Sequence, residues 1–591
     1  MRSGRQSAAI RELLPLIALY GVLSAVFCAP LFVLPQGLGI EDWDVHLFYH
    51  GAVLKNLLEY GQLPFWNPWY CGGNVMWQNP QVALLSPVYP LSLIVSLALA
   101  MKINIVLHYW IGLVGMHVLL TRGIGLSFTA LVVFLAAVFA FSGAPALHLA
   151  AGHSDFLPAF YLPLQLFFFL RALKTRAVRD ACLAGAALAL FIYNGGLHIV
   201  PMSLISIGAL SIVASIAQRR WRPVVLAILV GAAGLAYAAP KLVPIVSFVT
   251  SDRFWDARPL TKERDAMSDE MLLRAYLDGY QYRNLHFPLQ RSGWHEYGNY
   301  IGLLGALLIA SSIVWVFMDR GSPEWWLGVS LAVTSILLLV FSAGQFSPVA
   351  PASLITHLPF FSQFRIPSRY TIVFVLFGTV TAAWVARDFE LAGAFAGTGR
   401  RFITIVCVLA SIDLVVRNQT QLEAVFSVPA ATSGFRWLQR APTLVTDASS
   451  NAYAKNSPMF TTLLAGRSFY NCYEPLQLVH TADADHSLIF TDGNSTMFGT
   501  TFTPNRVEFA VLGGAQPSRI LLNQNFAPGW HSTLGQVTRD PASGKPSVLL
   551  PPKEAGKFSF WFVPPGLIAG LVVFLLAVAL SVAAWRKRLP A

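Results

Sequence analysis

Long apolar runs recur along this chain, separated by short polar segments, as far as about residue 418. Most of these runs approach the roughly 20 residues that an α-helix needs to cross the hydrocarbon core of a membrane. We therefore expect a polytopic α-helical membrane protein. The pattern predicts about twelve membrane-spanning helices, near residues 13–34, 103–121, 128–148, 156–170, 180–195, 198–217, 223–248, 299–317, 326–345, 369–386, 402–418 and 564–585.

Residues 419–563 follow a different pattern. They are polar, rich in Thr, Ser, Asn, Pro and Gly, and contain short alternating runs such as Arg506–Leu512, Arg519–Leu522 and Lys557–Val563. Alternation with a period of two residues, bounded by turn-forming residues, predicts strands. We expect a small, mostly β domain in this segment, built as a sandwich, with some helix near Ser433–Gln439.

The composition agrees with this division into a membrane domain (1–418), a β-rich domain (419–563) and a last helix with a basic tail (564–591). The chain is 55% hydrophobic and only 12% charged, whereas soluble domains carry about 25% charged residues. The first apolar run follows basic residues, as in a signal peptide. It is long for one and lacks a small-x-small cleavage site, so we expect a retained helix.

The charge pattern predicts the topology. With these spans, the whole net charge of +12 lies in the loops of one side, in clusters such as Arg219–Arg222 and Arg586–Arg588. Cytoplasmic loops are enriched in Lys and Arg. Both termini are therefore expected in the cytoplasm, and the β-rich domain on the extracytoplasmic side of the plasma (inner) membrane. Because the membrane topology accounts for the excess of basic over acidic residues, nucleic acid is not an expected partner.

Two apolar segments need separate treatment. Counting Ala83–Ala100 as a span would place every later basic loop on the outer side of the membrane. Its Pro87 and Pro90 also fit poorly inside a helix. We therefore place this segment as a juxtamembrane helix at the outer interface. The span near 223–248 contains Pro240 and Pro244. Two prolines four residues apart predict a broken helix.

The first outer loop, 35–102, concentrates the candidate chemistry. Glu41, Asp42 and Asp44 follow the first helix directly. The apolar residues of Asp44–Tyr60 recur at helical spacing, which predicts a helix at the membrane interface. The indoles that follow in LPFWNPWYCGGN are expected to be exposed at the headgroup level.

Several motifs of this chain, taken together, resemble a known superfamily. They are DWDVH, GQLPFWNPWYCGGN, NPQ with SPVYPL, the GH before the fourth helix, EYGNYIG, FRIPSRY and NFAPGW. This set is similar to the GT-C glycosyltransferases, most nearly to the bacterial YfhO-like membrane proteins. The resemblance implies a GT-C-like fold. It also implies inverting transfer of a sugar from a polyprenyl-phosphate donor to an extracytoplasmic glycan, lipid or protein.

Such a transfer needs a base for the acceptor hydroxyl, and a carboxylate within hydrogen-bond reach suits this role. The resemblance places the base at Asp42 or Asp44. We favour Asp44 as the catalytic residue and Asp42 as its partner or as a metal ligand. The alternative is that both residues only cap the interfacial helix, where Asp is a favoured residue.

A second group of candidates is His153 with Asp155, in the turn after the third helix. They are predicted to bind substrate, and Asp155 to join Asp42 and Asp44 around Mg²⁺ or Mn²⁺, cations that prefer oxygen ligands. The alternative is that GHSD is an ordinary helix start.

The departing phosphate needs cations placed where negative charge develops. Arg365 and Arg369 flank Pro367, and an Arg fork matches phosphate geometry. Lys241 is a further candidate. The alternative for these residues is a role as cationic anchors at the membrane interface.

Two smaller predictions concern aromatic and sulfur-containing side chains. Trp66, Trp69 and Trp77 either stack on sugar faces or belong to the interfacial belt. Cys71 and Cys472 are both expected outside the membrane, where a disulfide is possible.

Two rival functions remain open. A transporter or flippase of lipid-linked sugars would show related halves and polar residues near the membrane midplane. A non-catalytic envelope assembly protein would act through its β domain. Convergence of Asp42, Asp44 and Asp155 in one outer cavity would favour the transferase.

Overall fold

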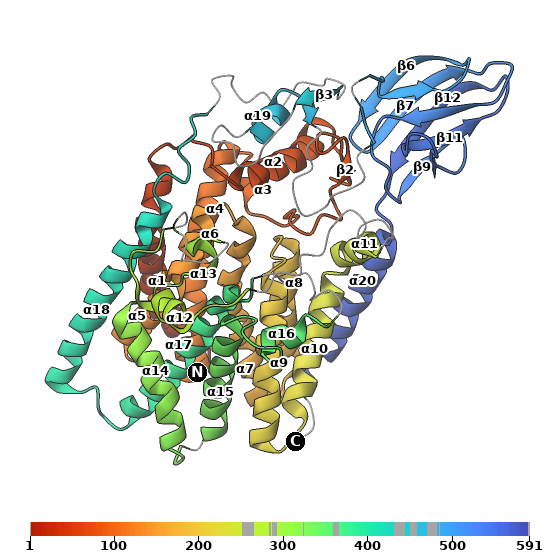
Figure 1. The fold of residues 1–591 in the computed structure, drawn as a ribbon. Helices are drawn as coiled ribbons and strands as arrows, with labels where there is room; N and C mark the ends of the chain where they lie inside the picture. Colours follow the sequence, from red (N-terminus) through yellow and green to blue (C-terminus); the bar gives the residue numbers. More distant parts are fainter. Residues whose placement is uncertain are drawn as a thin grey trace.

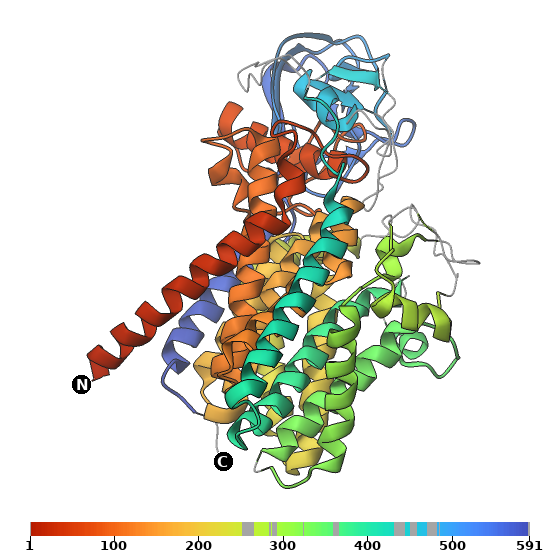
Figure 2. The same ribbon diagram turned by 90° about the vertical axis from the view of Figure 1, so that its left-hand side faces the viewer.

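The computed structural model describes residues 2–250, 265–282, 285, 292–322, 324–358, 366–430, 444–448, 458–469, 481–483 and 485–588. A bundle of long helices forms the body of the molecule, and a β domain stands beside one end of it (Figure 1). The segment between the first two bundle helices lies at the same end, next to the β domain (Figure 2).

The bundle is built from helices of 8 to 26 residues. They are α1 (Arg2–Phe27), α4 (Leu97–Val118), α5 (Thr129–Ala140), α6 (Gly143–Ala150), α7 (Leu162–Thr175), α8 (Val178–Tyr193), α9 (Ile199–Gln218), α10 (Arg222–Tyr237), α11 (Ala239–Val249), α14 (Gly302–Met318), α15 (Trp325–Ser342), α17 (Thr371–Leu391), α18 (Gly397–Gln419) and α20 (Leu567–Ala584). Shorter helical segments precede or connect them: η1 (Ala29–Phe32), α2 (Trp43–Leu54), η2 (Lys55–Glu59), α3 (Val88–Leu91), η3 (Leu119–Ile124), η4 (Ser154–Tyr161), α12 (Asp269–Leu277), α13 (Trp294–Tyr297), α16 (Pro351–Ile355), η6 (Pro367–Tyr370), η7 (Thr420–Leu422) and α19 (Pro458–Leu464).

Every predicted span coincides with a helix. In the described part of the chain, eight helices are long and apolar enough to cross a membrane, and the bent pair α10–α11 makes a ninth. The other three predicted spans correspond to α1, α8 and α18, which are not among these nine, so the count of twelve is approximate. The bend of 84° between α10 and α11 confirms the predicted broken helix at Pro240.

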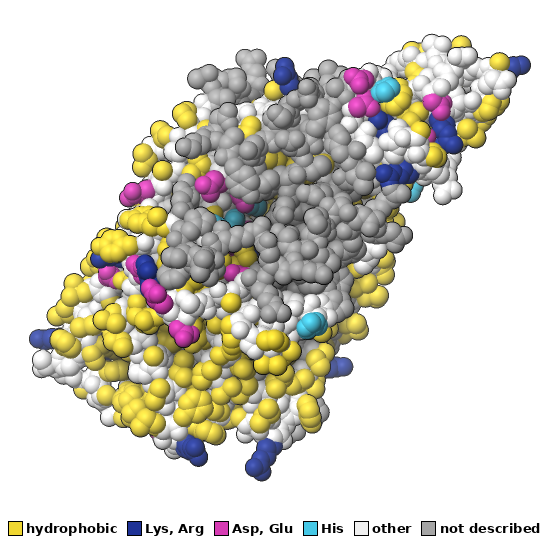
Figure 3. Space-filling model, in the orientation of Figure 1, with side chains coloured by type: hydrophobic (Ala, Val, Ile, Leu, Met, Phe, Trp, Pro, Cys, Tyr) yellow, Lys and Arg dark blue, Asp and Glu magenta, His cyan; other side chains and the backbone are white. Residues whose placement is uncertain are grey.

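The basic loops lie together at the end of the bundle away from the β domain. There the Val178 N–H donates to the Lys587 carbonyl oxygen at 3.2 Å, and Arg387 forms an ion pair with Glu324 at 2.8 Å. Lys and Arg side chains mark this end below a belt of hydrophobic side chains (Figure 3). The basic loops that were predicted to share one side therefore lie at the same end of the bundle, whereas the β domain carries further Lys and Arg side chains (Figure 3).

The first outer loop is more deeply buried than its sequence suggests. All residues of α2 are buried, as are Trp66 and Trp69. The prediction of exposed indoles was therefore wrong for these two residues, because the β domain and α19 cover the loop. The apolar segment Ala83–Ala100 is also not one juxtamembrane helix, since α3 spans only Val88–Leu91 and α4 begins at Leu97.

The β domain is a sandwich of two antiparallel four-stranded sheets, ordered β10–β11–β8–β5 and β6–β7–β12–β9. Alternate residues of β7 are buried, as the period of two predicted, and both sheets contribute to one hydrophobic core. The described strands of the chain are β1 (Trp66–Asn67), β2 (Asn74–Val75), β3 (Leu444–Ala448), β4 (Arg467–Phe469), β5 (Ile489–Thr491), β6 (Thr496–Thr503), β7 (Arg506–Leu512), β8 (Ser518–Leu522), β9 (Trp530–Ser532), β10 (Thr538–Arg539), β11 (Pro546–Leu550) and β12 (Ala555–Phe562). The helix expected near Ser433–Gln439 lies outside the described residues.

Trp66 of the first outer loop belongs to the core of this sandwich. Its ring centroid lies 5.0 Å from that of Trp530 and 4.8 Å from that of Phe562. Its Nε1–H donates to Gln524 Oε1, and its backbone N–H donates to Asn505 Oδ1, both at 3.0 Å. Trp66 thus completes the core of the sandwich, although it precedes its hydrogen-bond partner Asn505 by 439 residues. The loop and the sandwich pack as one unit.

A second contact joins the CGGN turn to the NFAPGW motif. The Asn525 backbone N–H donates to the Gly72 carbonyl oxygen at 3.0 Å, and its side-chain amide donates to the carbonyl oxygens of Cys71 and Gly73. Cys71 is disulfide-bonded, whereas its predicted partner, Cys472, lies outside the described residues. Two of the motifs that carried the family resemblance therefore bind each other.

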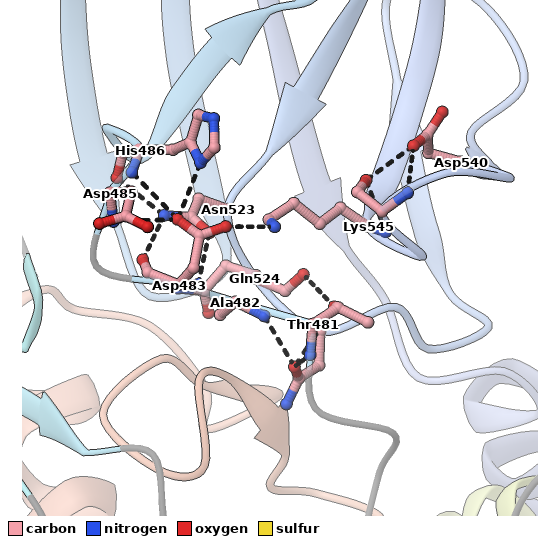
Figure 4. A network of polar contacts seen from close by, with 11 residues as sticks. Thr481, Ala482, Asp483, Asp485, His486, Asn523, Gln524, Asp540 and Lys545 are labelled. Carbon is pink, nitrogen blue, oxygen red and sulfur yellow. Dashed lines mark hydrogen bonds and ion pairs between the residues drawn. The ribbon is translucent and has the colours of Figure 1, made fainter. Parts of the chain in front are cut away.

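A polar network extends this contact into the sandwich (Figure 4). The Asp483 carboxylate accepts hydrogen bonds from Lys545 Nζ at 2.6 Å and from His486 Nδ1 at 2.8 Å. The Asn523 side chain accepts from the Asp483 backbone N–H and donates to the carbonyl oxygens of Asp483 and His486. Burial alone would raise the pKa of Asp483, but the bonds from Lys545 and His486 outweigh it and hold this pKa at about 2.

The Gly73→Ala variant tests the contact between loop and sandwich. Gly73 has φ +101°, and a Cβ there would lie 2.1 Å from Gln524 Oε1. Gly61, in the same loop, has φ +62° with nothing within 4 Å of a Cβ. Both Ala variants carry the roughly 1–2 kcal/mol cost of a left-handed conformation, and Gly73→Ala adds a clash of about 1–3 kcal/mol. Thermal unfolding should show a lower Tm for Gly73→Ala; equal Tm values would contradict this contact.

The Asp483→Asn variant tests the polar network through its pH dependence. An Asp with a depressed pKa contributes stability above its unfolded-state pKa of about 4, and this contribution is lost as the pH falls toward 2. We expect Asp483→Asn to lower the Tm at pH 7, and the difference from wild type to shrink between pH 4 and pH 2. Asp485→Asn is the control, and a pH-independent difference for Asp483→Asn would contradict the assignment.

Candidate active site

Polar side chains from several helix ends converge at the end of the bundle next to the β domain. We call this group the outer polar cluster. It combines the residue before α2, the end of α6 with the turn that follows it, the start of η4, the residue before α9, helix α13 and segment η6. Its members are Asp42, His148, His153, Asp155, His198, His295, Glu296 and Arg369.

Asp42 faces His153 across this cluster. Asp42 is the N-cap residue of α2 but makes no side-chain hydrogen bond to that helix. Its Oδ2 lies 3.6 Å from His153 Nε2, and His153 Nδ1 lies 3.0 Å from His148 Nδ1. Burial lowers the pKa of His153 to about 3. His153 is therefore neutral near pH 7, and its contact with Asp42 is not an ion pair.

A close backbone approach holds these two residues together. Gly152 has φ +88°, and a Cβ on it would lie 2.5 Å from the Trp43 backbone nitrogen. The Trp43 indole N–H donates to the Leu149 carbonyl oxygen at 2.7 Å. The turn before η4 thus rests directly on the start of α2, and glycine is required there.

Arg369 and Glu296 form the most strongly bonded pair of the cluster. Arg369 Nε and Nη2 donate to the two Glu296 oxygens at 2.6 and 2.5 Å; the Glu296 side chain is buried, and that of Arg369 is 15% exposed. Arg369 Nη1 donates to His198 Nε2 at 3.0 Å. Because a guanidinium only donates, His198 Nε2 carries a lone pair, and its imidazole is neutral with the proton on Nδ1.

Asp155 lies on the buried side of the same group. It is 5% exposed, and its Oδ2 lies 3.6 Å from His198 Nε2. The charges of Asp42, Asp155 and Glu296 all act on Arg369. Contacts through His198, His295 and Glu296 thus link Asp42, His153, Asp155 and Arg369 in one group. The roles predicted for these four residues stay predictions.

Four further members were not assigned a role from the sequence. His148 and His198 stand at the ends of predicted spans, whereas His295 and Glu296 stand in the polar loop before the span at 299–317, where Glu296 begins the EYGNYIG motif. That position marked them as outer residues. Arg369, for example, contacts Glu296, which is 73 residues away, and His198, which is 171 residues away. No local sequence pattern specifies such pairings.

Asp44 does not face this cluster, and the preference for it as the base has no support in the geometry. Its carboxylate is fully buried and accepts the backbone N–H groups of Met459 and Phe460, each at 2.9 Å. Burial raises the pKa of Asp44 to about 6, although these two bonds oppose the shift. Asp44 caps the first turn of α19 and so fastens that helix to α2.

The other two predicted phosphate ligands do not join the cluster either. Lys241 is buried and donates to the carbonyl oxygens of Pro80 and Val82. Nearby, the Trp77 indole N–H donates to the Pro240 carbonyl oxygen at 2.8 Å. These bonds fix the first outer loop to α11. Arg365 lies outside the described residues.

The predicted metal site is not assembled in this conformation. Among the residues that the structure describes, no three His, Cys, Asp or Glu side chains are arranged to hold a metal ion. Asp44 directs both oxygens to α19 and is not available to complete a set with Asp42 and Asp155. A requirement for Mg²⁺ or Mn²⁺ stays a prediction.

No protein-family model matches this sequence, and no curated protein matches it. Among solved structures, the chain is similar to the arabinofuranosyltransferase AftD from Mycobacteria, at 14% identity and a TM-score of 0.40, over 70% of this chain and 27% of AftD. It is also similar to the Archaeoglobus fulgidus oligosaccharyltransferase. The apo form gives 12% identity and a TM-score of 0.40, and the form tethered to an acceptor peptide gives 13% and 0.42.

Each oligosaccharyltransferase match covers 77% of this chain and 64% of that one, so the chain spans less than two thirds of the length of these proteins. These solved structures are GT-C glycosyltransferases. Likeness at such scores carries no argument about this chain, so its function must be argued from the site. The resemblance to YfhO-like proteins stays a prediction.

The Asp44→Asn variant tests the structural role of this carboxylate. Asn keeps one acceptor oxygen but turns an amide N–H toward a backbone N–H, so we expect a loss of about 1–3 kcal/mol. Hydrogen exchange should show weaker protection of Met459 and Phe460 in Asp44→Asn and unchanged protection in Asp42→Asn. Equal protection in the two variants would argue against the cap.

Proposed function

We propose that this protein is a membrane glycosyltransferase. It moves a sugar from a polyprenyl-phosphate donor to a hydroxyl group of an extracytoplasmic glycan, lipid or protein. The observation that supports this proposal best is the outer polar cluster. A partly exposed carboxylate, neutral imidazoles and a largely buried guanidinium meet there from distant segments, at the end of a membrane bundle covered by a sandwich.

Asp42 is the proposed general base. Its side chain is 20% exposed, and the neighbouring His153 is neutral. In the reaction, the acceptor oxygen attacks the anomeric carbon of the donor, and its proton passes to Asp42. The bond between the anomeric carbon and the phosphate oxygen breaks on the opposite face, which inverts the configuration. A positioned carboxylate base contributes about 10²–10⁴-fold to such a step.

The departing phosphate is proposed to lie beside Arg369. A guanidinium held by a bidentate carboxylate is already oriented, so it needs no reorganisation as negative charge develops. His198 and His295 adjoin this pair and are 28% and 25% exposed, which places polar N–H groups at the cluster's open side. Asp155 lies on the buried side of His198. Arg365 remains a predicted phosphate ligand, and Lys241 has a structural role.

The proposed orientation follows from the two ends of the bundle. The end with the basic loops and the chain termini faces the cytoplasm, because Lys and Arg are retained there. The cluster and the sandwich then lie on the extracytoplasmic side of the plasma membrane. A lipid donor reaches the cluster from the outer leaflet.

The two rival functions explain less of the structure. A transporter needs a substrate site near the midplane, whereas the described members of the cluster stand at helix ends. An assembly protein needs no convergent acids. Asp42 and Asp155 belong to one cluster with Arg369 through His153 and His198, although Asp44 does not.

The Asp42→Asn variant tests the proposed function. We expect sugar transfer in proteoliposomes to fall by about 10²–10⁴-fold with an unchanged Tm. The donors are undecaprenyl-phosphate-linked glucose, mannose and arabinofuranose, each assayed with and without Mg²⁺. Asp413→Asn is the matched control, because Asp413 is a partly exposed carboxylate that bonds Tyr300 outside the cluster. Full transfer by Asp42→Asn would overturn the assignment of the base.

A further inference from the structure

A small internal cavity adjoins the outer polar cluster. It has a volume of about 20 Å³ and lies between α2, the loop before α3, helix α4 and the start of η4. Its walls include Trp43 and Ser154, the chain neighbours of Asp42 and Asp155. The cavity therefore lies at the same junction of α2 and η4 that positions the proposed base.

Two buried polar atoms in the wall of this cavity are not hydrogen-bonded. Among the described residues, His108 Nε2 and Asn104 Oδ1 have no partner. The side chains that carry them are only 1% and 7% exposed. Buried polar groups are nearly always satisfied in folded proteins, so these two atoms point to a partner that the chain itself does not supply.

The hydrogen bonds of the two cavity histidines fix the tautomer of the neutral ring. His108 Nδ1 lies 2.8 Å from the Asn104 carbonyl oxygen, and His50 Nδ1 lies 2.9 Å from the His46 carbonyl oxygen. A carbonyl oxygen only accepts, so each Nδ1 carries a proton, and in the neutral imidazole each Nε2 then carries a lone pair. Burial lowers the pKa of His50 to about 4, which keeps it neutral near pH 7.

The residues that line the cavity carry neutral polar groups. They include two imidazoles, three side-chain amides and the hydroxyl groups of Ser86 and Ser154. A volume of about 20 Å³ holds one water molecule or one hydroxyl group, and it does not hold a carboxylate or an acetamido group. An O–H group can donate to an acceptor such as His108 Nε2 and can accept from an amide or a hydroxyl group. The ligand chemistry that fits is a single neutral O–H group.

We propose that this cavity is the subsite for one hydroxyl group of the transferred sugar. A water molecule fills it when no donor is bound. This inference rests on the proposed function and adds a specificity to it. The enzyme accepts sugars with an unsubstituted hydroxyl at that ring position and rejects deoxy and N-acetylamino sugars there.

The test compares variants of His108 that differ in one acceptor atom. His108→Phe keeps a ring and removes the Nε2 lone pair, whereas His108→Gln retains an acceptor near that position. His117→Phe is the matched control, since His117 is a buried histidine on the same helix that bonds Tyr20 outside the cavity. Binding of undecaprenyl-phosphate-linked glucose, mannose and arabinofuranose, and of their monodeoxy analogues, is measured by thermal stabilisation without turnover.

We expect His108→Phe to bind the preferred donor about five- to tenfold more weakly, as for the loss of one neutral hydrogen bond. His108→Gln should restore part of this loss, and His117→Phe should bind like wild type. One monodeoxy donor should bind wild type as weakly as the parent sugar binds His108→Phe, and the two losses should not add.

Two results would overturn the proposal. If wild type and His108→Phe bind the donor with equal affinity and sugar transfer is intact, the cavity is a water site and not a hydroxyl subsite. The proposed function is then unaffected. Failure of wild type to bind any of the lipid-linked sugars would overturn the subsite together with the proposed function. A His108→Phe variant that loses its fold is recognised by its Tm, and the monodeoxy series on wild type then decides.

Discussion

The placement of helix α2 is the constraint on which the rest of the outer end depends. On one side, Gly152 lets the turn before η4 approach the start of α2, and the Trp43 indole bonds the Leu149 carbonyl oxygen. On the other side, Asp44 caps α19. Because α2 is held on both sides, the Asp42 carboxylate has a fixed position over the cluster, as a catalytic base requires.

The first outer loop and the sandwich stabilise each other. Trp66 fills the sandwich core, and Asn525 binds the turn around Gly72. The hydrogen bonds of Lys241 fasten the same loop to α11. These bonds satisfy loop backbone groups that would otherwise be buried without partners. The β domain is therefore part of the structure that positions the site, in addition to any contact it makes with an acceptor.

The cluster also shows how charge is tolerated at the end of a membrane bundle. Arg369 is largely buried, and three of its N–H groups donate to Glu296 and His198. A buried ion pair is tolerated only when its remaining hydrogen-bonding groups are also satisfied. His153 and His198 are neutral, so they add polar contacts to the cluster without adding charge. The result is a rigid, preorganised group in place of a set of mobile surface charges.

Local periodicity was sufficient for much of the fold. The apolar runs located the bundle helices, Pro240 located the broken one, and the alternation of Arg506–Leu512 located β7, because helix and strand bury residues with different periods. Composition identified the membrane domain, and the polar turns between spans located Asp42, His153 and Asp155 at one outer end. These features follow from short-range sequence, and so they were predictable.

Only the tertiary structure decided which of these residues act together. Asp42 and Asp44 are two residues apart, and at about 100° per residue along a helix they point to opposite sides. The sequence did not specify which side holds the cluster and which holds α19. In the same way, only long-range packing buries Trp66, pairs Arg369 with Glu296 and ties Lys241 to backbone carbonyl groups. Each of these contacts joins distant segments, and such pairings leave no periodic signal in the sequence.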